Sequence, residues 1–337
     1  MSSHAVNDAS LTFETTKFLD GDYPQYPDEF CTLSGGNLFP IEYFPIFRRK
    51  TPAVIRAYTA ITPALYLLSK IIREKSQTWA IFVRRKILGS QDVFLDDTAV
   101  CPVSDEEVIS AITSNIPDFE FTDRMHLDTI GETNLRPGLP RDLVVLDYNL
   151  IRVLTSSGTS SSRKIAALVL IAVTIGHEIA HILEFRCLRG GLLNSDGTPF
   201  ESPPGITGGE VGIAWEHRAF GASVHSVCEK EEEISLLVGL CLRSFSWNYK
   251  YMVADPQWLL KLFREDHWEN SDHPLRPPIA GYAFLAVLED EVLGVASRGS
   301  PVKMRRGADL SVLHERGTSR PSLFLSGAKK CRKRVVS

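Results

Sequence analysis

The pattern in this sequence that is most specific for chemistry is His177-Glu178-Ile179-Ala180-His181, in which two histidines four residues apart enclose a glutamate. In a helix this spacing places both imidazole rings on one face, about one turn apart, where two neutral ring nitrogens can bind one zinc ion. The Glu178 carboxylate lies beside that face and can accept a proton from water that the metal activates. The pattern predicts His177 and His181 as metal ligands and Glu178 as the general base.

The flanking residues predict that this pattern lies on a buried helix. Residues 164–188 favour one long helix, which Ser/Thr-rich residues precede and Gly190-Gly191 follows. Residues 165–175 are apolar apart from Thr174, so the ionisable groups that follow should also be buried. Such burial is costly unless the groups are paired or bind a metal. The apolar run is much shorter than the ~20 residues that span a bilayer, so we expect no transmembrane helix.

A catalytic zinc site needs a third protein ligand and an open position for water. No third histidine follows at the metzincin spacing, where Glu184 and Cys187 stand instead, and Cys187 is more simply interpreted as a buried thiol. The candidates are therefore carboxylates on the next expected helix, namely Glu210 and Glu216.

The two glutamates differ in their structural alternatives. Thr207 and Glu210 form a capping-box pattern, which would explain Glu210 without a metal. Helical spacing aligns Glu216 with apolar residues such as Ile213 and Phe220, so its carboxylate should be buried and need a partner. We expect Glu216 as the third ligand, with Glu210 as the alternative.

These residues resemble a known group of enzymes. Gly176-His177-Glu178-Ile179-Ala180-His181, followed by Glu216-x-x-x-Phe220-Gly221-Ala222, is similar to the gluzincin type of zincin-like zinc metallopeptidase, and distantly to ImmA/IrrE-type peptidases. The resemblance covers roughly residues 164–227, and Gly221 replaces an alanine of that pattern. It implies a Zn²⁺ cofactor, the ligands His177, His181 and Glu216, and Glu178 as base. It also implies that a strand near residues 143–154 is the sheet edge along which a peptide lies.

The remaining sequence predicts an α+β fold that is mostly helical, with a small sheet beside the active-site helix. Helices are expected at 55–87, from Ser104 to about 112, at about 207–227, 257–263 and 279–293, and strands at 143–146 and 150–154. Residues 1–50 are expected to be an irregular N-terminal segment, 51–295 the zincin-like metallopeptidase domain, and 296–337 a disordered tail.

Charge and cysteine content indicate the compartment. The net charge is −4, but the tail after residue 295 holds 11 basic and 2 acidic residues, which leaves −13 for the rest of the chain. The cluster at 329–334 is typical of nuclear import or nucleic-acid contact, although a solvated terminus explains it more simply. The six cysteines form no C-x-x-C pair, and no signal peptide or nucleotide-binding loop is apparent, so we expect a cytoplasmic or nuclear protein.

The sequence thus predicts a zinc-dependent metallopeptidase that hydrolyses peptide bonds of a peptide or protein substrate. The alternative is a non-catalytic zincin-fold protein that uses the metal for structure or for binding a partner. Glu178 favours the enzyme, because a structural zinc site is usually closed by four ligands and needs no base. A helper that polarises the substrate carbonyl is also expected, and the candidates are His217, Tyr148, Tyr282 and His225.

Overall fold

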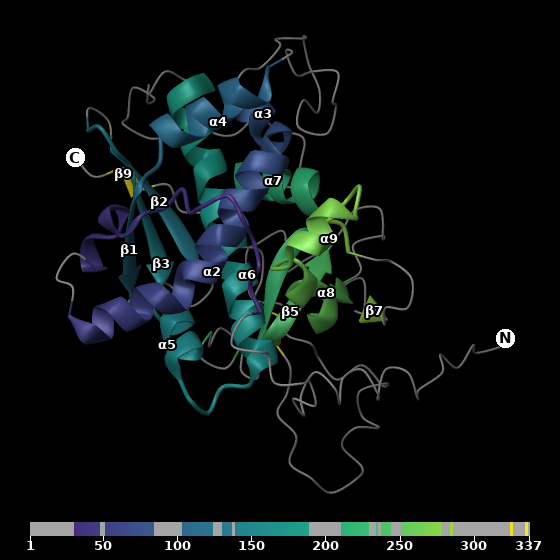
Figure 1. The fold of residues 1–337 in the computed structure, drawn as a ribbon. Coiled ribbons are helices and arrows are strands. Elements are labelled where there is room, and N and C mark those ends of the chain that lie inside the picture. Colours follow the sequence, from purple (N-terminus) through teal and green to yellow (C-terminus); the bar gives the residue numbers. More distant parts are fainter. Residues whose placement is uncertain are drawn as a thin grey trace, which may run out of the picture.

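A computed structural model of the protein describes residues 30–47, 51–83, 103–123, 130–136, 139–188, 210–228, 234, 237–243 and 251–277, and three two-residue strands at 284–285, 324–325 and 334–335. The described residues form a mixed fold of helices and two small sheets (Figure 1), which confirms the expected α+β class.

Helix α6 (Ser161–Leu183) is at the centre of the fold. Its N-cap Ser160 accepts a hydrogen bond from the Arg163 amide, and every residue from Ile165 to Leu183 is buried. The helix packs against α2, α7, β2 and β5 and continues as a π-helical turn, η5 (Glu184–Leu188). Figure 1 shows it between the two sheets. The long helix expected from the sequence is confirmed and begins three residues earlier than expected.

Among the described residues, one helix is long and apolar enough to cross a membrane, namely α6 together with η5. All of its most apolar stretch is buried inside the protein, which is also the pattern of a core helix.

The first sheet has the order β1-β3-β2-β9. Strand β1 (Asp118–Thr122) is parallel to β3 (Leu143–Asp147), and β2 (Gly131–Leu135) is antiparallel to β3. Strand β9 (Arg334–Val335) pairs with the last two residues of β2 only. The β3 strand is confirmed, but it lies inside the sheet, so the expectation that it forms the edge is wrong.

Residues 150–154 are not a strand, because they belong to helix α5 (Asn149–Thr155). The Asp147 carboxylate accepts a hydrogen bond from the Asn149 amide and turns the chain directly after β3. Leu150, Ile151 and Leu154 then repeat at helical spacing, and this short apolar run fits a helix as well as a strand.

The second sheet is antiparallel and has the order β7-β6-β5-β4-β8. Its strands are β4 (Ser223–Cys228), β5 (Leu237–Arg243), β6 (Tyr251–Val253), β7 (Phe284–Leu285) and β8 (Phe324–Leu325). The helix expected to reach residue 227 ends earlier, since α7 (Val211–Phe220) stops at Gly221, whose φ of 76° is left-handed. Val224 and Val227 favour the strand that follows.

The other described elements lie around this centre. They are η1 (Ile41–Tyr43), η2 (Pro45–Phe47), α2 (Pro52–Glu74), η3 (Ser76–Trp79), α3 (Ala80–Val83), α4 (Asp105–Ser114), α8 (Pro256–Lys261) and α9 (Glu265–Glu269). The helix expected at 55–87 is confirmed as far as residue 83, where this described range ends, but as three segments, α2, η3 and α3. Pro63 lies inside α2 without ending it. The helices expected at 104–112 and 257–263 correspond to α4 and α8. The helix expected at 279–293 and the basic tail lie outside the described residues, apart from the three short strands.

Candidate metal centre

His177 and His181 of α6 and Glu210, which precedes α7, meet at one point. Each offers one ligand atom, and these atoms lie within 4.8 Å of one another. The Glu210 Oε1 atom is 2.5 Å from His181 Nε2 and 3.4 Å from His177 Nε2. Ligands about 2.0–2.1 Å from a tetrahedral zinc ion are about 3.4 Å apart, so the spacing is of the right order for one metal ion.

The burial of this group fits a metal site. The His177 and His181 side chains are 0% and 2% exposed. Both Nε2 atoms, and His181 Nδ1, make no hydrogen bond of normal geometry to any residue that the structure describes. Buried polar atoms without such bonds are uncommon and costly, and a metal ion would satisfy the two Nε2 atoms together. Glu210 is 17% exposed, so solvent reaches the group from its side.

Glu210 is held in place by the helix that it precedes. It is the N-cap of α7, and its carboxylate accepts hydrogen bonds from the Gly212 and Ile213 amides. The free amides of a helix N-terminus favour a negative charge at this position. The capping role expected for Glu210 is therefore present, but as the cap residue itself, and the same carboxylate faces both histidines. Thr207 lies outside the described residues.

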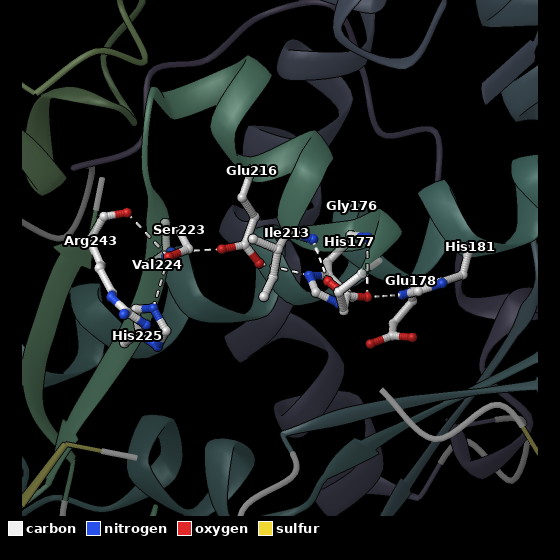
Figure 2. A network of polar contacts seen from close by, with 12 residues as sticks. Gly176, His177, Glu178, His181, Ile213, Glu216, Ser223, Val224, His225 and Arg243 are labelled. Carbon is white, nitrogen blue, oxygen red and sulfur yellow. Dashed lines mark hydrogen bonds and ion pairs between the residues drawn. The ribbon is translucent and has the colours of Figure 1, made fainter. Parts of the chain in front are cut away.

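Glu216 lies on the other side of the His177 ring. Its Oε1 is 2.7 Å from His177 Nδ1, and its Oε2 accepts a hydrogen bond of 2.6 Å from the Val224 amide (Figure 2). Glu216 is buried and has partners, as expected, and these include a ring nitrogen and a backbone amide. Of the two candidate carboxylates, it is therefore that of Glu210 which lies with both histidine Nε2 atoms.

Two glycines allow α7 to lie directly against the part of α6 that carries the H-E-x-x-H residues. A Cβ atom on Gly212 would lie 2.1 Å from His177 Cδ2, and one on Gly176 would lie 2.3 Å from the Trp215 ring. Trp215 also stacks on Trp79 of η3, with ring centroids 4.8 Å apart. This packing sets how the residues of α7 face His177. Gly212 was not expected to be part of the site, and its only signal in the sequence is a glycine in the first turn of a helix.

The Glu178 carboxylate points away from Glu216 (Figure 2) and is buried. Thr133 of β2 donates a 2.7 Å hydrogen bond to its Oε2. Gly131 of the same strand allows this approach, because a Cβ atom there would lie 2.4 Å from Thr174 Cγ2 and 3.1 Å from Glu178 Oε1. The expected base is thus held by the sheet, while the expected ligands face α7.

Of the expected carbonyl-polarising residues, none of the three that the structure describes belongs to the ligand group. His225 Nε2 lies 2.9 Å from the Ser223 hydroxyl, and the Tyr148 ring lies beside Arg152. Burial, together with the nearby Arg243 and Arg276, lowers the pKa of His217 to about 4 against the opposing effect of Glu216, so this ring is neutral at pH 7. Tyr282 lies outside the described residues.

The charges of the group are strongly coupled. Burial alone would lower the pKa of His177, but the carboxylates of Glu210 and Glu216 outweigh it and raise this pKa to about 10. The two histidines hold the pKa of Glu210 well below its usual range, against the effect of burial. In the metal-free protein, His177 is therefore an imidazolium between two carboxylates at neutral pH.

This proton predicts that metal binding depends on pH. A metal ligand must be deprotonated, so Zn²⁺ has to displace the His177 proton at any pH below about 10. We expect the apparent zinc affinity to rise about 10-fold per pH unit between pH 7 and 8.5, where a histidine of ordinary pKa near 6.5 would no longer contribute. Competition with a chelator of known affinity measures this slope. An affinity that is constant above pH 7 would contradict the coupling.

In comparisons with protein-family models, curated proteins and solved structures, nothing matches this chain. The function must therefore be inferred from the site itself.

Proposed function

We propose that this protein is a zinc-dependent metallopeptidase with a zincin-like fold. The observation that carries the proposal is the convergence of His177, His181 and Glu210. This group joins the two histidines of an H-E-x-x-H helix to a carboxylate that can serve as the third ligand. Three protein ligands with access for solvent are the arrangement of a catalytic zinc site, whereas a structural site is usually closed by four.

The donor set supports zinc as the metal. Two imidazoles and one carboxylate suit zinc in hydrolytic enzymes, whereas calcium and magnesium prefer sites made of oxygen atoms. A pair of histidines and one carboxylate also occurs in iron enzymes, but the glutamate of the H-E-x-x-H pattern, Glu178, favours hydrolysis. When bound, zinc would supply Lewis-acid polarisation of the scissile carbonyl and a lowered pKa for its water.

Glu178 would move the proton in this reaction. Its carboxylate would accept a proton at Oε1 or Oε2 from the attacking water and pass it to the leaving amine. The Thr133 hydroxyl donates to Oε2 and thereby orients the carboxylate. His177 and His181 would hold the metal from α6, and Glu210 would hold it from the start of α7.

The substrate would lie along β2 rather than along β3, which is inside the sheet. At the outer edge of β2, the short strand β9 pairs with Asn134 and Leu135. On its other side, β2 pairs with β3 through Gly131 to Asn134. An extended peptide added at this edge would pass next to Glu178, which Thr133 contacts.

Zinc-loaded protein should cleave peptides in a mixed peptide library, and a chelator should abolish this activity until zinc is restored. Mass spectrometry of the products measures cleavage, and elemental analysis measures about one zinc per chain. Zinc binding without cleavage would favour the non-catalytic alternative, whereas the absence of zinc binding would contradict both functions.

A further inference from the structure

We propose that Glu216 is a positioning residue, which fixes the ring orientation and the proton of His177 so that His177 Nε2 can bind the metal. This inference rests on the proposed metal centre and assigns Glu216 a role other than ligand.

The Glu216 carboxylate lies at the Nδ1 atom of the His177 ring. A neutral imidazole carries one proton, and the nitrogen that hydrogen-bonds to a carboxylate keeps it. The Glu216 Oε1 atom lies 2.7 Å from His177 Nδ1, so the proton of the neutral ring belongs on Nδ1. The lone pair is then on Nε2, the nitrogen that faces Glu210. Metal-binding histidines commonly have such a carboxylate partner.

Glu216 itself is held firmly by its neighbours. It is 1% exposed, and its Oε2 accepts the Val224 amide, which lies just beyond the left-handed turn at Gly221. The preceding residue, Trp215, is fixed between Trp79 and Gly176. The position of the Glu216 carboxylate is therefore fixed by the turn that connects α7 to β4, and the carboxylate in turn orients the His177 ring.

The two histidines differ in the hydrogen bonds of their Nδ1 atoms. His181 Nδ1 makes no hydrogen bond to any described residue, so the structure shows such support at His177 alone. The first-turn residue Gly212 also lies against the His177 ring and limits its rotation. A change at Glu216 should thus act on the metal through one ligand.

Glu216→Gln tests this role with almost no change in shape. Both Glu216 oxygens accept hydrogen bonds from N–H groups, whereas an amide has only one acceptor oxygen. In one orientation of the new amide, its NH₂ group faces the Val224 N–H, so two donors oppose each other. In the other orientation, its NH₂ group faces His177 Nδ1, so the His177 proton must move to Nε2, which blocks metal binding. We expect zinc affinity to fall about 10- to 100-fold, as for other carboxylates that support metal ligands.

A matched control is Glu184→Gln, which makes the same change at another buried glutamate, in the π-helical turn that follows α6, and should leave zinc affinity unchanged. In cobalt-substituted protein, the visible absorption bands should keep their positions in Glu216→Gln, because the ligand set is the same. Shifted bands would make Glu216 a ligand and overturn the inference, as would wild-type affinity in this variant.

A measurement on the wild-type protein covers the case in which the variant does not fold. Nitrogen NMR of the zinc-loaded protein should show the His177 proton on Nδ1, and a proton on Nε2 would overturn the inference. Failure of the wild-type protein to bind zinc would instead contradict the proposed function, so the two failures can be told apart.

Discussion

Replacing Glu178 by Gln is expected to abolish peptide hydrolysis while zinc content and thermal stability stay close to the wild-type values. The amide fills the same space and can still accept from Thr133, but it cannot take a proton from water. General base catalysis contributes about 10²- to 10⁴-fold, so kcat should fall by at least about 100-fold.

The rate should be measured on a peptide that the wild-type protein cleaves, with zinc content determined in the same samples. Glu184→Gln again serves as the matched control and should retain activity. A Glu178→Gln variant that keeps its full rate would show that another group accepts the proton.

Replacing Glu210 by Ala is expected to lower zinc affinity by more than about 100-fold, because the variant loses an anionic ligand rather than the support of one. Chelator competition measures this loss. The loss should exceed that of Glu216→Gln, and the reverse order would restore Glu216 as the third ligand.

The cap role of Glu210 needs a separate measurement, because loss of an N-cap costs about 0.5–2 kcal/mol of stability. Glu210→Gln keeps a side-chain oxygen for the Gly212 and Ile213 amides but removes the charge. Unfolding of both variants in a chelator separates the two effects. Only the alanine variant should lose the cap, whereas both variants should bind zinc weakly.

The sequence predicted best those features that one segment determines. The α6 helix follows from its apolar run and its hydroxyl-rich start, and the H-E-x-x-H spacing places both histidines on one helix without reference to other elements. The N-cap at Ser104 is equally local, since its hydroxyl accepts from the Glu107 amide three residues later.

The sequence predicted poorly those features that depend on two segments. Helical spacing showed that Glu216 would be buried, but it could not show that a left-handed turn at Gly221 brings the Val224 amide to the same carboxylate. It also could not show that Glu210 reaches the histidines, because this depends on how closely Gly212 lets α7 approach His177. The position of β3 inside the sheet likewise depends on pairing with β1, which is distant in sequence.

The most direct test of the central claim is a crystal structure of the zinc-loaded protein, with anomalous diffraction data collected on both sides of the zinc absorption edge. The proposed site predicts one anomalous peak within bonding distance of His177 Nε2, His181 Nε2 and a Glu210 oxygen, with Glu216 still on His177 Nδ1. A peak bound by Glu216, or no peak at these histidines in protein soaked with zinc, would contradict it.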